Sequence, residues 1–295
     1  MSSENLAEWL RRQHYTVIRT ASSNWVDAGP SVYQAFPYHW LISPSDEEVA
    51  QLFSDHHAIG IRYSAPLNAQ KGALSYHVVY QEAGYGLDCL SKKARHDVEK
   101  GASISTLQPI SFQQLAKEGW KLRQETLLRQ GRQRVENREW WTKLCMSAEG
   151  LDGFEAWGAI AHNELVAALF TFSYDDCFSI LYHQSLTSYL PYGINNFLAY
   201  SVTREILKRP GPPNLFYGIQ SLDAPSTVDN FKFRMGYIAK PVRQVVEFHP
   251  LLKPLANPFS GAILNGVHKI FPSNRVLAKA AGMVQFYSQG VSPAA

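Results

Sequence analysis

The amino-acid sequence predicts an α+β fold in which a mixed β-sheet is flanked by helices. Three β-rich runs occupy residues 154–162, 165–174 and 177–184, and the short turns between them indicate an antiparallel meander. A helical segment at 191–209 and an apolar run at 214–219 follow. Because a helix that joins two strands of one sheet usually forms a right-handed crossover, the last run is predicted to lie parallel to its neighbour.

The helix at 191–209 is the most clearly patterned element of this part of the chain. Pro191 suits its first turn, and the prolines at 210–213 end it. Its apolar positions recur on one helical face, which we expect to be buried: Ile194, Phe197, Leu198, Val202 and Ile206.

Other segments are assigned from the period of their apolar residues. Residues 90–101 form an apolar stripe of Leu90, Ala94 and Val98 on a basic helix, which Gly101 is expected to end. The remaining expected elements are helices at 46–56, 111–130 and within 131–145, strands at 57–65, 73–81 and 241–250, and a short helix between 223 and 237.

The length of 295 residues favours two domains or one large one. We expect an N-terminal partial lobe at 1–103, a C-terminal domain at 104–250 and a basic tail at 251–295. The tail is interpreted as irregular, apart from a helix within 274–287. That helix could be an amphipathic membrane contact, but docking on the domain is the favoured alternative.

The charge of the chain is small but uneven. Residues 231–295 contain eight lysines and arginines against one acid, although the formal net charge of the whole chain is only +3. Such regions attract polyanions such as RNA, CoA phosphates or anionic lipid, and a solvated surface is the alternative. The three cysteines have no metal-binding spacing, so we expect no metal and a reducing, cytoplasmic setting.

Neither a signal peptide nor a transmembrane segment is expected from the sequence. The N-terminus has no apolar core of the kind that signal peptides carry. No run reaches the roughly 18 apolar residues of a spanning helix. The expected location is therefore cytoplasmic, with peripheral membrane association left open.

Two motifs carry a resemblance to a known family. They are "LSKKARHDVEKG" at 90–101 and "DAPSTVDNFKFRMGY" at 223–237. Together with the order of elements over residues 75–250, they resemble the FemAB-like (BioF2-like) branch of the GNAT acyltransferase superfamily. The resemblance implies two GNAT-like lobes, the first shortened or degenerate. It also implies transfer of an acyl group, or of an aminoacyl group from tRNA, to an amine.

One loop departs from the pattern of acetyl-CoA enzymes, which have Q/R-x-x-G-x-G/A after the fourth strand. Here the corresponding stretch, 183–196, has one glycine, Gly193, and Pro191 lacks an N–H donor. A cradle for the CoA pyrophosphate is therefore not expected. Aminoacyl-tRNA is favoured as the donor, and acyl-CoA remains the alternative.

Lys232 is the leading candidate for catalysis. On a helical wheel, Val228, Phe231 and Met235 form the buried stripe and Lys232 lies at its edge, whereas Arg234 points away. An inward lysine could stabilise the oxyanion formed when an amine attacks an acyl ester or thioester. The alternative is that Lys232 snorkels to solvent.

Asp223 is the second predicted catalytic residue, because it could pair with Lys232 or take a proton from the amine. The alternative is a turn residue, and Ser226 is expected to cap the helix. Tyr182, His183 and Gln184 end the strand at which a GNAT fold opens its acyl groove, and His183 could be a general base. The predicted substrate-binding residues are Lys92, Arg95, Tyr182, His183, Gln184, Tyr192 and Arg234.

The sequence thus supports an N-acyltransferase that works by direct attack in a cleft. An acyl-CoA-dependent GNAT N-acetyltransferase is one alternative. A catalytically inert GNAT-like module that binds RNA or a protein is the other, and the short first half of the chain motivates it.

Overall fold

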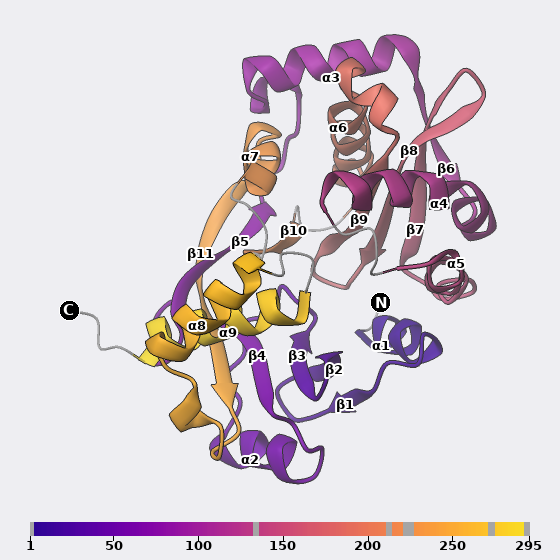
Figure 1. The fold of residues 1–295 in the computed structure, drawn as a ribbon. Coiled ribbons are helices and arrows are strands. Elements are labelled where there is room, and N and C mark those ends of the chain that lie inside the picture. Colours follow the sequence, from indigo (N-terminus) through magenta and orange to yellow (C-terminus); the bar gives the residue numbers. More distant parts are fainter. Residues whose placement is uncertain (1–2, 132–135, 211–213, 221–226, 271–274, 292–295) are drawn as a thin grey trace. The chain divides into compact units, whose positions relative to one another are not determined.

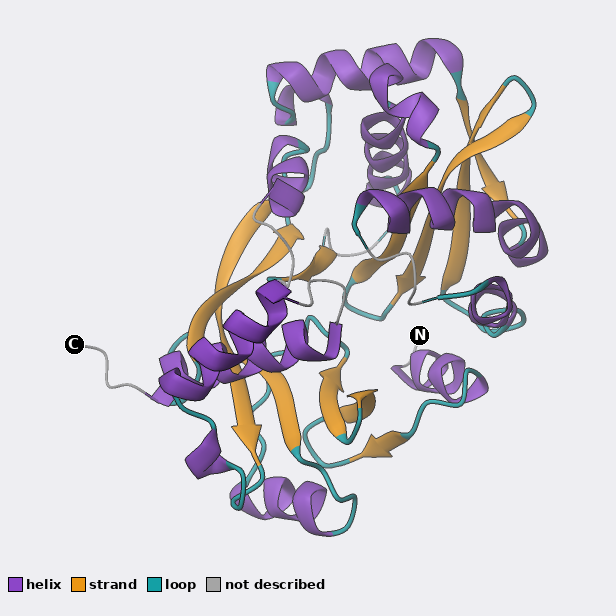
Figure 2. Ribbon diagram, in the orientation of Figure 1, coloured by secondary structure: helices purple, strands orange, loops and turns teal. Residues whose placement is uncertain are grey.

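The computed structural model describes residues 3–131, 136–210, 214–220, 227–270 and 275–291. The chain forms two compact units that are interleaved in sequence. Unit 1 holds Met1–Gln13, Val78–Gly218 and Ser226–Ile238, and unit 2 holds His14–His77, Ile219–Pro225 and Ala239–Ala295. These compact units differ from the lobes expected from the sequence, which were bounded at residues 103 and 250. The division into such lobes stays a prediction. Figures 1 and 2 trace the elements named below.

The sheet of unit 1 contains the meander. Its strands are β6 (Thr106–Ile110), β7 (Phe154–Ala161), β8 (Glu164–Ser173), β9 (Phe178–Ser185) and β10 (Leu215–Ile219). They lie in the order β10-β9-β8-β7-β6. The pairs β6–β7, β7–β8 and β8–β9 are antiparallel. β10 is parallel to β9. The predicted meander and parallel crossover are confirmed.

Helices flank this sheet on both faces. α4 (Phe112–Arg129) and α5 (Arg138–Met146) pack together, and α4 contacts β8 and β9. α6 (Ile194–Leu207) contacts β7, β8 and β9. Residues 165–172 of β8 are all buried, which requires cover on both faces of the strand. The α+β class with a mixed sheet flanked by helices is confirmed, and the predicted face of α6 is buried.

α1 (Ser3–Arg12) is a helix that the sequence analysis did not predict. Trp9 fixes it in unit 1, because its Nε1 donates to the carbonyl oxygen of Leu144 at 2.9 Å. The Trp9 ring also lies beside Phe154 and Phe170 of the meander. The first residues of the chain therefore complete the core around strands that follow about 140 residues later.

α3 (Lys92–Ile104) runs past the residue that was expected to end it. Leu90, Ala94 and Val98 are buried as predicted. Gly101, however, lies inside the helix, and a Cβ at that position would meet the Cβ of Phe197 at 2.5 Å. The expectation for Gly101 was wrong because its role is close packing of α3 on α6 rather than a C-cap.

Unit 2 has its own mixed sheet. Its elements are β1 (Val17–Arg19), β2 (Asn24–Gly29), β3 (Val32–Phe36), α2 (Asp46–Ser54), β4 (Gly60–Ala65) and β11 (Ile238–Phe248). The order is β1-β2-β3-β4-β11, with β3 and β4 parallel and the other pairs antiparallel. β5 (Ala73–Tyr80) begins in unit 2 and ends in unit 1. Trp25, Leu52 and Ile61 belong to the core.

The tail is helical rather than irregular, which corrects the expectation for residues 251–295. After the 3₁₀ turn Lys253–Leu255, α8 (Pro258–Ile270) and α9 (Arg275–Val291) pack against each other. α9 was predicted, and it buries Met283 and Phe286 beside Val246 of β11. α8 was missed because Gly261 and Gly266 lower its helix propensity, whereas packing on α9 favours the helix.

No helix among the described residues combines the length and the apolarity needed to cross a membrane.

Candidate functional site

The central feature of unit 1 is the divergence of two parallel strands. β9 and β10 pair at Phe178 with Leu215 and at Ser179 with Phe216, and among the described residues their register ends there. β9 nevertheless continues to Ser185. Backbone groups of β9 beyond Ser179 are therefore not in register with β10. Such an edge can bind a substrate carbonyl or amide through main-chain hydrogen bonds.

His183 and Tyr217 meet where the two strands diverge. Nδ1 of His183 lies 2.7 Å from the hydroxyl oxygen of Tyr217 on β10. Nε2 of His183 and Oδ1 of Asn195, at the start of α6, are both buried, and the Asn195 amide lies near enough to the imidazole to affect its pKa, although neither atom makes a hydrogen bond of standard geometry. Buried polar atoms of this kind are expected to bind water or a ligand.

The environment makes His183 a weak base. Burial lowers the pKa of His183 from 6.5 to about 4, and the positive charge of Arg129 acts in the same direction, whereas the amide of Asn195 opposes the shift. The imidazole is therefore uncharged at pH 7. A role as general base stays a prediction, and the low pKa counts against it.

Lys232 also contacts Tyr217. It belongs to α7 (Thr227–Arg234), and its Nζ donates to Oδ1 of Asp229 at 2.8 Å. The side chains of Lys232 and Asp229 are only 12% and 11% exposed. Nζ lies 5.1 Å from the centroid of the Tyr217 ring, within range of a cation–π interaction. A Cβ on Gly218 would be 3.8 Å from Nζ, so the ammonium lies beside the β10 backbone.

The wheel therefore distinguished the two cations of α7 correctly. Lys232 turns inward, Met235 is fully buried and Arg234 is exposed. The partner was not foreseen: Lys232 pairs with Asp229, three residues earlier. A spacing of three residues on a helix could have suggested this pair. Asp223 and Ser226 lie outside the described residues.

Two of the predicted substrate-binding segments come together near α7. The backbone N–H of Ser91, which caps α3, donates to the carbonyl oxygen of Arg234 at 2.9 Å. Lys92 and Arg234 are both exposed. Nε of Arg95 donates to the carbonyl oxygen of Leu87, which restrains that guanidinium. The start of α3 and the end of α7 thus form one basic surface.

Tyr182 and Gln184 are placed differently from His183. The ring of Tyr182 lies 5.1 Å from the guanidinium carbon of Arg123, and Nε of Arg123 donates to Oε2 of Glu136 at 2.7 Å. This ion pair was not predicted, because its residues are far apart in sequence. Gln184 is 1% exposed, and neither atom of its amide has a hydrogen-bond partner in the structure.

The loop before α6 is closed by α3. Gly193 has a left-handed backbone, with φ of 71°, and a Cβ there would collide with the carbonyl oxygen of Asp97 on α3. Nζ of Lys100 donates to the carbonyl oxygen of Pro191 at 2.8 Å and lies 5.3 Å from the centroid of the Tyr192 ring. α3 therefore packs directly against the loop that precedes α6.

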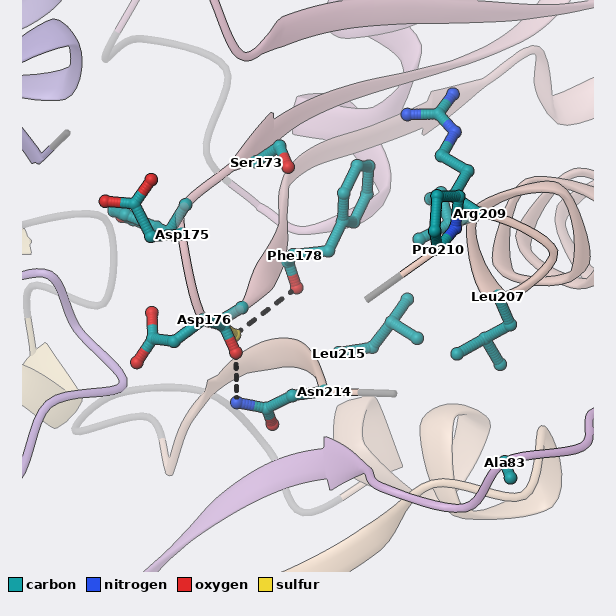
Figure 3. A pocket seen from close by; sticks show the side chains of 13 residues that line it. Ala83, Ser173, Asp175, Asp176, Phe178, Leu207, Arg209, Pro210, Asn214 and Leu215 are labelled. Atoms are coloured by element: carbon teal, nitrogen blue, oxygen red, sulfur yellow. Dashed lines mark hydrogen bonds between the residues drawn. The ribbon is translucent and has the colours of Figure 1, made fainter. Parts of the chain in front are cut away.

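A cavity of about 230 Å³ lies at the opposite end of β9, where β9 and β10 are paired (Figure 3). Nδ2 of Asn214 donates to the carbonyl oxygen of Asp176 at 2.9 Å. Arg209, on its wall, is held by both carboxylate oxygens of Glu155. Burial raises the pKa of the nearby Cys177 thiol well above its ordinary range, so this thiol is a poor nucleophile. We therefore do not place the reaction here.

Within the part of the chain that the structure covers, no three His, Cys, Asp or Glu side chains gather as metal ligands would.

Comparisons with known proteins were informative only at the level of structure. No known protein family and no curated protein sequence matches the chain. The structure is similar to that of FemX, with a TM-score of 0.56 and 8% sequence identity over 84% of this chain and 92% of FemX.

Two further solved structures have comparable similarity. The C-terminal domain (DUF2156) of a putative lysylphosphatidylglycerol synthetase from Agrobacterium fabrum gives a TM-score of 0.54 and 12% identity, over 84% of this chain and 89% of that domain. L-PGS from Bacillus licheniformis gives 0.52 and 11%, over 82% of this chain and 90% of that chain. Together with the strand order of unit 1, these similarities show that the chain has the fold that these three structures share.

Proposed function

We propose that this protein is an N-acyltransferase that moves an acyl or aminoacyl group from an activated donor to an amine. The observation that carries the proposal is the divergence of β9 and β10 beside the nearly buried pair of Lys232 and Asp229. An open strand edge can hold a carbonyl group, and the ammonium provides a fixed positive charge next to it. The fold shared with FemX agrees with this reading.

In the proposed reaction, the neutral amine attacks the carbonyl carbon of the donor. A C–N bond forms, the carbonyl oxygen becomes negatively charged, and Lys232 stabilises it with an N–H that is not directed at Asp229. Collapse of this intermediate breaks the ester or thioester bond, and the proton lost by the amine balances the charge of the leaving group. Orientation of the amine supplies much of the remaining acceleration.

Asp229 acts on this chemistry through Lys232. A carboxylate 2.8 Å from Nζ favours the charged form of the lysine and fixes its direction. Tyr217 contacts both Lys232 and His183, and so joins the cation to β9. His183, neutral at pH 7, is proposed to hydrogen-bond the substrate rather than to carry charge.

Aminoacyl-tRNA is proposed as the donor in preference to acyl-CoA. The supporting observation is the close packing of Gly193 against Asp97, which leaves less room beside the loop that acetyl-CoA enzymes use for pyrophosphate. The exposed cations Lys92 and Arg234 offer a surface for the RNA backbone. Nothing in the described residues identifies the acceptor beyond its amine.

The donor is tested by titration calorimetry of the purified protein with acetyl-CoA and with longer acyl-CoAs. Because α3 packs directly against the loop that precedes α6, no binding tighter than about 1 mM is expected. A dissociation constant in the micromolar range would instead support the acyl-CoA alternative. Native mass spectrometry of the same sample is expected to reveal co-purified tRNA, and a co-purified CoA species would contradict the proposed donor.

A further inference from the structure

The outer face of α8 is apolar and exposed. Phe259, Ile263 and Ile270 are 75%, 51% and 71% exposed, and they lie within roughly 100° of one another on the helix. Ala262 and Gly266, which lie between them, are exposed as well. An ordinary surface helix has polar residues on its outer face, so this arrangement requires an explanation.

The opposite face of α8 already has a partner. A Cβ on Gly261 would lie 3.3 Å from Cγ1 of Val284, which belongs to α9. Figure 1 shows α8 and α9 side by side, and α9 in turn packs against β11. α8 is therefore held with one face on unit 2 and the other turned outward.

Two further exposed apolar side chains precede the helix in the chain. Leu251 and Leu255 are 80% and 66% exposed, and Leu255 ends the 3₁₀ turn Lys253–Leu255. We use the name α8 surface for Leu251, Leu255, Phe259, Ile263 and Ile270. An exposed apolar surface of this kind marks a site of interaction with a protein or a membrane.

Charge distinguishes between these partners. From Leu251 to Ala295 the sequence contains four cations and no aspartate or glutamate: Lys253, Lys269, Arg275 and Lys279. A two-fold dimer through the α8 surface would bring two such segments together with no acid from either to compensate them. A bilayer with anionic headgroups complements both the apolar face and the positive charge.

We propose that the α8 surface is an interfacial anchor that binds the headgroup region of an anionic lipid bilayer. Phe259, Ile263 and Ile270 enter the boundary between headgroups and acyl chains. Lys253, which is exposed beside Leu255, contacts lipid phosphates. The helix lies in the plane of the interface and does not cross it, since its 13 residues span only about 20 Å. This inference does not depend on the proposed acyl transfer.

Vesicle flotation of the full chain tests the proposal. The vesicles are phosphatidylcholine alone, or phosphatidylcholine with phosphatidylglycerol at about one third of the lipid. Wild type is expected to float with the anionic vesicles, and less with the neutral ones. The double variant Phe259→Ser/Ile263→Ser should bind at least roughly tenfold more weakly. Lys253→Glu should weaken binding to anionic vesicles by roughly tenfold and leave neutral vesicles unaffected.

Leu74→Ser is the matched control. Leu74 is 70% exposed on β5 in unit 2 and does not belong to the α8 surface, so this variant should bind as wild type does. Circular dichroism confirms that each variant is folded. Absence of vesicle binding by wild type, or equal binding by the double variant, would overturn the proposal. Light scattering that shows a dimer abolished by Phe259→Ser/Ile263→Ser would assign the surface to a second copy instead.

Discussion

Nζ of Lys232 lies 2.8 Å from Oδ1 of Asp229, one helical turn away on α7, and both side chains are almost entirely buried. A nearly buried ion pair contributes little net stability, because desolvation offsets most of the attraction. Its position where β9 and β10 diverge agrees with the proposed role of Lys232 in acyl transfer.

Lys232→Met is expected to lower the free energy of unfolding by about 3 kcal/mol, because it leaves the carboxylate of Asp229 without this counter-ion. The double variant Lys232→Met/Asp229→Leu should recover most of that loss, since two apolar residues need no compensation. Urea denaturation of the single and double variants measures both values. If the losses of the two single variants simply add in the double variant, the pair is not coupled.

His183 should give the protein a pH-dependent stability. The folded pKa is about 4 and the ordinary value is 6.5, so between these limits the unfolded chain binds a proton that the folded chain does not. Stability is therefore lost as the pH falls from 6.5 to 4, by about 3 kcal/mol at most. His183→Gln should remove this loss, as measured by urea denaturation across that range.

His77 provides the internal comparison for that experiment. Burial also lowers its pKa from 6.5 to about 4, but it belongs to unit 2. His77→Gln should remove a separate part of the stability that the protein loses between pH 6.5 and 4. If His183→Gln has the same stability profile against pH as the wild type, the imidazole of His183 in the wild-type protein must titrate with an ordinary pKa.

Arg123 and Glu136 form another nearly buried ion pair of unit 1, at 12% and 8% exposure. Glu136→Ala should destabilise the protein by about 3 kcal/mol, because the guanidinium between Trp141 and Tyr182 loses its counter-ion. Thermal denaturation measures the effect. Breaking the exposed pair of Lys121 and Glu164 with Glu164→Ala should cost less than about 1 kcal/mol. Equal costs would show that burial of the first pair is not important.

Gly193 should tolerate no side chain. Gly193→Ala combines an unfavourable φ of 71° with a collision against the backbone of Asp97, so we expect a loss of more than about 2 kcal/mol. Gly150 has a φ of 73° with open space around it, so Gly150→Ala should cost only about 1 kcal/mol. Chemical denaturation compares the two variants. A Gly193 variant as stable as the Gly150 variant would show that α3 does not close the loop.

Periodicity predicted the elements of the meander, α3 and α6 because their apolar residues recur at the spacing of one buried face. It also identified Lys232 as the inward cation of α7. It missed α1 and α8, whose helices depend on packing with segments distant in sequence. His183 was noticed, but its contact with Tyr217 was not, because a hydrogen bond across two diverging strands leaves no local pattern.

The role of Lys232 is tested most directly by transfer of a labelled aminoacyl group from aminoacyl-tRNA to an amine under single-turnover conditions. Asp229→Asn and Arg234→Ala are measured in parallel, the latter as the exposed cation of the same helix. Loss of an oxyanion contact should slow Lys232→Ala by about 10²–10³-fold. Arg234→Ala, at saturating donor, should retain the wild-type rate. Undiminished transfer by folded Lys232→Ala would contradict the account.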